Sequence, residues 1–395
     1  MMRLFDQSRE LGGIDHLDSR LGHRATVREV ARLDVLLRSR AALGLAPASA
    51  PGVIFLPLGF LLGPHGFNLL SPTALAYLSP IVTVGLAALG VFVGLGLGSP
   101  RRLDRHLFAA SSIEATVTVA VVAGAVWLVA FIQPGVVPGI LPVLALSFGI
   151  VASASSAGAA EVSNAPVHRI ATRIADLDDV APIVAGGLIF AWLRAPEIGG
   201  TLWFLGLTIA VALLVALAGW LLLGRSAGGA EHVAFFAGLL LLLGGSAQFL
   251  SLSALLAGMV AGIAWSAAPG GCHERIRDLL GRIQHPVVVL LLLAAGASVA
   301  PAAIPLALLV GFVVFRVAGK RVGGWLASRM TRAEAPGDLG LFLTAPGVIG
   351  VAFALNLAQV LAPEAASLLI SVSVLGSLAG EIVALLLLPR LERHR

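Results

Sequence analysis

Long apolar stretches follow one another along most of the chain. Each is continuous rather than alternating, and most have roughly the 20 residues that an α-helix needs to cross a bilayer. A transmembrane β-barrel would show short segments of alternating polarity. The pattern therefore predicts an all-α polytopic membrane protein with about twelve transmembrane helices. The segments lie at about 50–63, 73–97, 107–132, 136–158, 167–193, 201–224, 230–244, 247–266, 284–300, 302–327, 337–360 and 365–389.

Composition favours the same fold class. The chain has 395 residues, of which 58% are hydrophobic and only 12% are charged. With a single cysteine, Cys272, no intrachain disulfide can form, and nothing resembles a Cys/His zinc cluster. Residues 1–49 mix acids and arginines without an apolar core, so we expect a cytosolic or membrane-surface extension rather than a signal peptide. Its arginines could bind nucleic acid, but orienting the first span is the simpler role, and we expect no nucleic-acid partner.

Positive charges are distributed unevenly between the predicted loops. If the N-terminus is cytoplasmic, the loops on the opposite side carry only Arg194. This asymmetry follows the positive-inside rule and would be lost if one span were missed. We therefore expect an even number of crossings in the cell (inner) membrane, with both termini in the cytoplasm. The cytoplasmic loops and tail would carry Arg101, Arg102, Arg105, Arg169, Arg225, Arg275, Arg277, Arg282, Arg329, Arg332, Arg390, Arg393 and Arg395.

Three carboxylates, Asp176, Asp178 and Asp179, interrupt the segment 167–193. An ionisable group at bilayer depth costs at least ~2.5–3.5 kcal/mol by insertion scales, so a functional site is the default hypothesis. Asp178 and Asp179 lie near the middle of the span, and adjacent helical positions point roughly 100° apart. One carboxylate can therefore face an ion cavity while the other meets a neighbouring helix. The alternative is a buried ion-pair network without a transport role, and Asp176, nearer the cytoplasm, is more peripheral.

Burial and a nearby cation act in opposite directions on the proton affinity of a carboxylate, so a suitably balanced group can exchange a proton for a metal cation. Segment 302–327 supplies two candidate cations on one helical face, Arg316 near its middle and Lys320 one turn nearer the cytoplasm. Depth favours Arg316 as the partner of the carboxylates. Lys320 is the only lysine in the chain, and a buried lysine can release its proton whereas an arginine effectively cannot. The alternative for Lys320 is that it extends to the cytoplasmic interface with Arg321.

Two spans are interrupted by small polar residues or by proline and glycine, at 148–158 and 343–350. Such a run can unwind and offer hydroxyls and backbone carbonyls to a hard monovalent cation. Interruptions at matching places in two halves of a chain are the best sequence indication of a transporter's midplane site. The candidate contacts are Ser153, Ser155, Ser156 and Thr344, and the weaker buried polar candidates are Glu114, Glu161, Asn164 and Glu381.

Familiar catalytic motifs are missing from the sequence. It contains no Walker A loop, HExxH, GxSxG or nucleotide-binding glycine fingerprint, which argues against ATP drive and against intramembrane hydrolases. No nucleophile–base pair or metal triad is visible either. We therefore expect a protein that is not an enzyme and that holds no cofactor.

Five stretches, in order over about residues 50–390, carry a resemblance to a known family: Leu58–Gly66, Val91–Leu95, Ala175–Ile183, Val314–Lys320 and Thr344–Gly350. They are similar to an early glycine-rich hairpin, a span end, an ion-binding motif, a span with a buried basic residue and a second broken helix. In this order they resemble the monovalent cation:proton antiporter superfamily, most closely its bacterial Kef/Na⁺–H⁺ exchanger-like branch.

This resemblance implies an inverted-repeat antiporter fold with two crossing broken helices in a core of about residues 107–193 and 302–389. The remaining helices would form a panel for homodimerisation. Asp179 takes the position of the carboxylate that binds the monovalent cation and the proton, with Asp178 beside it and Arg316 at the basic position. Ser153, Ser155 and Ser156 match the hydroxyl-rich first break. The sequence departs from the family pattern at Ala157-Gly158, where relatives often have proline, and in lacking an arginine after the second break. In related proteins an Asp-Asp pair tends to go with a buried lysine and electrogenic exchange, and an arginine with electroneutral exchange, so the Asp pair beside Arg316, with Lys320 one turn away, leaves the proton stoichiometry open.

From these observations we expect a secondary antiporter that exchanges H⁺ for a monovalent cation, with Na⁺ favoured, by alternating access. We expect it to function as a homodimer in pH homeostasis, with no cofactor besides the transported ions. The alternatives are a K⁺/H⁺ antiporter of the same fold and a non-transporting, sensor-like or degenerate homologue.

Overall fold

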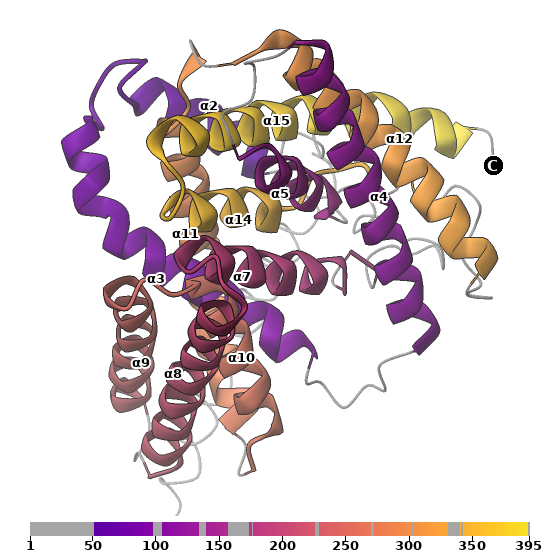
Figure 1. Cartoon of the computed structure of the whole chain (residues 1–395). Coiled ribbons are helices and arrows are strands. Elements are labelled where there is room, and N and C mark those ends of the chain that lie inside the picture. Colours follow the sequence, from indigo (N-terminus) through magenta and orange to yellow (C-terminus); the bar gives the residue numbers. More distant parts are fainter. Residues whose placement is uncertain are drawn as a thin grey trace, which may run out of the picture. The chain divides into compact units, whose positions relative to one another are not determined.

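The structure is a computed structural model that describes residues 51–97, 105–133, 140–156, 174–175, 177–225, 229–269, 272–301, 304–330, 340 and 343–393. Within these ranges the chain is mainly helical (Figure 1). One isolated bridge joins two extended segments. The expected N-terminal extension, residues 1–49, lies outside the described residues, and so do Asp176, Glu161 and Asn164.

The helices of the described part correspond one to one to the predicted apolar segments, which confirms the all-α fold class. Six of them, α3, α4, α8, α9, α11 and α15, are long and apolar enough to cross a membrane. In order, the helices are α2 (Pro51–Leu62), α3 (Pro72–Leu97), α4 (Arg105–Ile132), α5 (Leu141–Ser153), α7 (Val180–Arg194), α8 (Ile198–Arg225), α9 (Ala230–Phe249), α10 (Ala254–Ala267), α11 (Cys272–Ala297), α12 (Leu306–Met330), α14 (Val348–Ala358) and α15 (Pro363–Arg393).

Large apolar side chains on the outer faces of several helices fit a bilayer rather than water. Trp203 of α8, Phe131 of α4 and Phe249 of α9 are 69%, 83% and 87% exposed. Clusters of such residues on a soluble surface would favour association or aggregation. In a multi-pass membrane protein, lipid covers them, and the hydrophobic character of the chain extends from its interior to its surface.

Helices α3 and α10 pack closely because glycines face each other across their crossing. Gly90 and Gly94 of α3 lie opposite Gly258 and Gly262 of α10, and each pair is spaced four residues apart. A Cβ at any of the four would overlap the backbone of the other helix. Lipid tails are as apolar as leucine, so van der Waals packing of this kind, rather than burial from water, holds membrane helices together.

A second glycine face brings α12 against α4 (Figure 1). A Cβ at Gly319 would lie 3.1 Å from Thr118 Cα, and one at Gly323 would lie 2.9 Å from the carbonyl oxygen of Glu114. Lys320 follows Gly319 directly, so its side chain lies beside Glu114 and Thr118 of α4.

The two predicted interruptions cross each other. Helix α5 ends at Ser153, Ala154 continues in an extended conformation with φ −66° and ψ 129°, and α14 starts only at Val348. The N–H of Ser156 donates to the carbonyl of Ala345 at 2.9 Å, and the N–H of Gly347 donates to the carbonyl of Ala154 at 3.3 Å. The two interruptions thus form a short antiparallel bridge that joins the end of α5 to the start of α14.

Ser155 and Pro346 face each other in this bridge. They occupy its non-hydrogen-bonded pair, the position at which neither residue has to donate an N–H. Proline, which has no N–H, therefore fits there without leaving a bond unmade. This geometry confirms the predicted fold of two crossing broken helices. Residues 157–173 and 331–339, which flank the crossing, lie outside the described residues.

The glycine crossing of α3 and α10 yields a testable prediction. Gly258→Leu inserts a side chain where even a Cβ overlaps the carbonyl of Ala87, and overpacking of this kind typically costs about 1–3 kcal/mol. We expect a lower apparent melting temperature for the detergent-solubilised protein. Gly206→Leu on α8 is the matched control, because a Cβ there meets nothing within 4 Å. Equal melting temperatures for the two variants would contradict the close-packing account.

Candidate functional site

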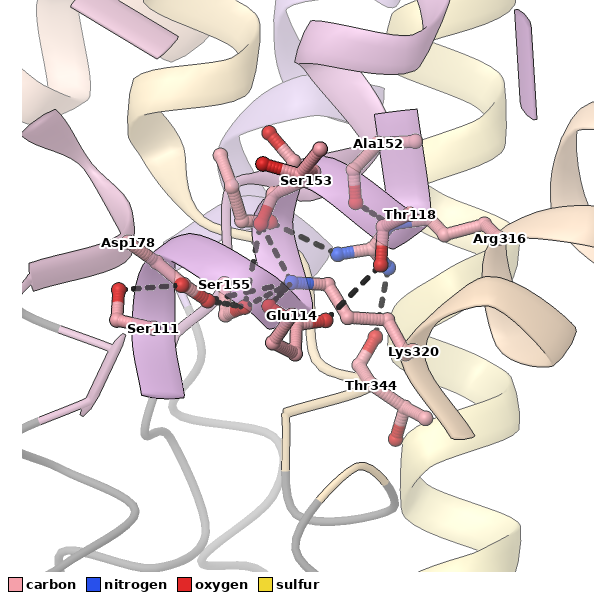
Figure 2. Close-up of polar contacts among 12 residues, drawn as sticks. Ser111, Glu114, Thr118, Ala152, Ser153, Ser155, Asp178, Arg316, Lys320 and Thr344 are labelled. Atoms are coloured by element: carbon pink, nitrogen blue, oxygen red, sulfur yellow. Dashed lines mark hydrogen bonds and ion pairs between the residues drawn. The ribbon is translucent and has the colours of Figure 1, made fainter. Parts of the chain in front are cut away.

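The ammonium group of Lys320 lies inside a cage of four oxygen atoms (Figure 2). Its Nζ is 3.0 Å from Glu114 Oε2, 2.6 Å from Ser155 Oγ and 3.3 Å from Asp178 Oδ2, and it also donates to the carbonyl of Ser153. The side chains of the lysine and of both carboxylates are 0% exposed. The structure thus places Lys320 in the interior and not at the cytoplasmic interface.

Four separate stretches of sequence build this cage. Glu114 comes from α4, Ser153 and Ser155 from the end of α5 and the break after it, Asp178 from the helical residues just before α7, and Lys320 from α12. The glycine face of α12 sets its distance from α4, and the bridge between the two interruptions sets the position of the break. The cage therefore exists only when the whole group of helices has assembled.

Asp178 is held by two hydroxyls as well as by the lysine. Ser111 Oγ donates to Oδ1 and Ser155 Oγ donates to Oδ2, both at 2.8 Å. A hydroxyl has one proton to donate and can accept at the same time, so Ser155 accepts from Lys320 while it donates to Asp178. Hydrogen bonds to an ionised group are roughly twice as strong as neutral ones, and Ser155 links the two charged groups.

Asp179 lies next to this network at the start of α7. Its backbone is helical, with φ −70° and ψ −22°, and its carbonyl accepts from the N–H of Ile183 at 3.3 Å. Ile174, Ala175, Leu177 and Asp178 before it are also helical. Asp179 as a residue is partly exposed, although its Oδ1 is buried, whereas Asp178 is fully buried. The neighbouring carboxylates therefore occupy different environments.

Glu114 belongs to the site, although the sequence pattern marked it only as one of the weaker candidates. Thr118 Oγ1 donates to its Oε1 at 2.9 Å, and Lys320 holds its Oε2. One sequence signal could have identified it. Ser111, Glu114 and Thr118 are spaced by three and four residues, which places them on one face of an otherwise apolar helix.

Arg316 differs from its expected role. Depth in the span favoured it as the partner of the carboxylates, but its three hydrogen bonds go to backbone carbonyls: Nε to Ala152 at 3.0 Å, Nη2 to Ala154 at 2.9 Å and Nη1 to Thr344 at 2.6 Å. The planar guanidinium matches several acceptors at once, and the end of α5 supplies carbonyls that lack helical partners. Lys320, one turn further along α12, reaches the carboxylates instead.

The other predicted contacts in the breaks take part mainly through their main chain. Ser153 Oγ donates back to the carbonyl of Ile150 at 2.9 Å, and its own carbonyl accepts from Lys320. Thr344 accepts from Arg316 through its carbonyl, and Ser156 donates its N–H across the bridge. Of the predicted hydroxyls, that of Ser155 is the one that the structure brings into the cage.

Removing the lysine charge tests how the cage is stabilised. Lys320→Met leaves Glu114 and Asp178 buried without their cation, and breaking a buried pair in this way typically costs about 3–5 kcal/mol. We expect a marked fall in the melting temperature of the detergent-solubilised protein at neutral pH. In the triple variant with Glu114→Gln and Asp178→Asn, the uncompensated charges are gone and much of the stability should return. A triple variant as unstable as Lys320→Met would show that lost packing, and not charge, is responsible.

The sequence matches no protein-family model and no curated protein. Among solved structures, it is similar to the sodium proton antiporter MjNhaP1 from Methanocaldococcus jannaschii, with a TM-score of 0.59 and 16% sequence identity. The match covers 89% of this chain and 99% of that chain. At this level of identity the likeness establishes the fold: the chain has the helical architecture of that antiporter over nearly its whole length.

Proposed function

We propose that this chain is a secondary antiporter that exchanges protons for a monovalent cation across a membrane by alternating access. The observation that carries the proposal is the buried cage of four oxygens around Lys320 Nζ. The fold shared with a protein described as a sodium proton antiporter supports it. We propose Na⁺ as the preferred cation, K⁺ as the alternative, and a homodimer with cytoplasmic termini that serves pH homeostasis.

The cage has the chemistry of a monovalent cation site. Carboxylate, carbonyl and hydroxyl oxygens are the ligands that hard cations prefer, and Glu114, Ser153, Ser155 and Asp178 supply all three kinds. The lysine ammonium is itself a compact monovalent cation. It occupies the place that a transported ion would take, so an entering ion has to displace the ammonium from these oxygens.

Charge balance supplies the coupling. When all three groups are ionised, Glu114 and Asp178 together carry one more charge than Lys320 can neutralise. An uncompensated charge in a low-dielectric interior is costly. Either one proton or one monovalent cation neutralises the cage, and both would compete for the same oxygens. A divalent ion would leave an excess of positive charge, so we expect it to be excluded.

Asp179 is the carboxylate that we propose receives the ion from the aqueous side. It adjoins Asp178 in the chain and is more exposed, so an incoming ion can reach it before the cage. In this scheme Asp179 exchanges its proton for the cation and passes the cation to Asp178 and Glu114, where it competes with the ammonium of Lys320.

Proteoliposomes that contain the full chain and a pH-sensitive dye test the proposal. We expect Na⁺, K⁺ or Li⁺ to dissipate an imposed pH gradient at about pH 6 to 9, and Asp179→Asn and Asp178→Asn to slow the response at least about tenfold, because each removes a carboxylate on which exchange depends. Asp278→Asn, at an exposed position of α11, is the matched control. If none of the three cations dissipates the pH gradient with the wild-type protein, the antiporter proposal is wrong, and the chain is a non-transporting membrane protein.

Lys320→Gln tests the competition between ammonium and ion. Without the tethered ammonium, a cation enters the cage without displacing it, so the half-saturating cation concentration should fall, by roughly tenfold if the displacement costs about 1.4 kcal/mol. Arg321→Gln, an exposed neighbour on α12, controls for loss of a positive charge. An unchanged half-saturating concentration with a lower maximal rate would indicate that Lys320 supports the structure without competing for the ion.

A further inference from the structure

Arg316 is one of the largest fully buried side chains of the described residues, although the cage does not include it. It lies one turn before Lys320 on α12, and Figure 2 shows its guanidinium directed toward the breaks. Each of its three nitrogens donates to a different backbone carbonyl, those of Ala152, Ala154 and Thr344.

The first two carbonyls belong to the end of a helix. The last carbonyls of an α-helix have no intrahelical partner, and within a bilayer there is no water to replace it. Between them, the two cations of α12 satisfy three successive carbonyls at the end of α5, since Lys320 takes Ser153 and Arg316 takes Ala152 and Ala154. Positive charge at a helix C-terminus is also favoured by the helix dipole.

The third carbonyl belongs to the other interruption. Thr344 precedes Pro346, which faces Ser155 in the bridge, so the guanidinium bonds to both breaks at once. Among the described residues, the bridge contributes backbone hydrogen bonds from the N–H groups of Ser156 and Gly347. The guanidinium adds three bonds from a planar, permanently charged fork that reaches both segments.

The surroundings of Arg316 leave room for this fork. On α15, a Cβ at Gly380 would lie 3.0 Å from Nη1, so a glycine lets the guanidinium approach. The neighbouring Glu381, which is partly buried, interacts electrostatically with Arg316. Glu114 and Asp178 attract the arginine charge as well, but the hydrogen bonds of Arg316 go to the carbonyls of the breaks.

We propose that Arg316 is a positioning residue whose guanidinium fastens the two breaks to each other and thereby fixes the carbonyl of Ser153 and the hydroxyl of Ser155 in the cage. Ala152 and Ala154 flank the carbonyl of Ser153, and Ser155 follows Ala154, so a shift of these two anchors moves two of the four cage oxygens. The structural part of this assignment is independent of transport, and its effect on ion affinity rests on the proposed function.

Arg316→Lys separates fastening from charge. A lysine keeps the positive charge, but its single ammonium cannot span three carbonyls that the guanidinium reaches with three nitrogens. We expect hydrogen exchange of the Ser156 and Gly347 amides, followed by mass spectrometry, to accelerate by about tenfold or more, since the crossing loses charge-assisted bonds. Exchange in the α3–α10 crossing, far from Arg316 in sequence, should keep its wild-type rate.

Gly380→Ala gives a second variant that retains the arginine. Its methyl group would crowd Nη1 at 3.0 Å, so we expect a smaller acceleration at the same two amides. Gly206→Ala, where a Cβ meets nothing within 4 Å, is the matched control. Gly380→Ala keeps Arg316 and every charge. The comparison of Gly380→Ala with Gly206→Ala can therefore be made even if Arg316→Lys does not yield a stable protein.

Transport provides the second readout. Arg316→Lys should raise the half-saturating cation concentration by about tenfold and lower the maximal rate less, because the cage is distorted while its carboxylates remain. Wild-type exchange at the Ser156 and Gly347 amides in both variants would overturn the assignment, whatever happens to transport. Accelerated exchange in a protein whose wild type moves no cation would uphold the fastening role and refute the antiporter proposal.

Discussion

A helix that ends inside a membrane exposes carbonyl oxygens where no water can reach them, and the protein itself has to supply the donors. In this chain the end of α5 has such carbonyls, and Arg316 and Lys320 on one face of α12 donate hydrogen bonds to them. The glycines that bring α12 against α4, and the bridge that joins the two interruptions, follow from the same requirement. The buried polar residues therefore stabilise the fold as well as forming the candidate site.

The two cations of α12 divide this work according to their chemistry. A guanidinium keeps its charge under all ordinary conditions and bonds in a fixed plane, which suits the permanent junction between two segments of backbone. An ammonium is a single point charge on a flexible stem and can give up its proton. It suits a position among carboxylates and hydroxyls that another cation can also occupy. In the roles that we propose, one helical turn of α12 separates a structural cation, Arg316, from an exchangeable one, Lys320.

Much of the fold followed from the sequence because the apolar segments, the hydroxyl-rich run and the Pro-Gly pair are local signals. The assignments that depend on contacts between distant helices were harder. Counting residues from the membrane surface favoured Arg316 over Lys320, since depth along a helix does not reveal which acceptors face each position. Glu114 was underrated because its importance comes from the glycine face of α12, far away in the sequence. Ser153 contributes its backbone carbonyl to the cage. Every residue has a carbonyl, so the pattern of side chains does not show which one takes part.

Lys320 is the only lysine in the chain and lies where the charges of the site meet. The only lysine side-chain amine of the chain therefore lies inside the candidate site. Lysine labelled with ¹⁵N during expression would give a single side-chain resonance from the centre of the protein, and an amine reagent would find one internal target, reachable only when the interior opens to solvent. The Lys320 amine can therefore report on the state of the site in the natural sequence, without an engineered probe.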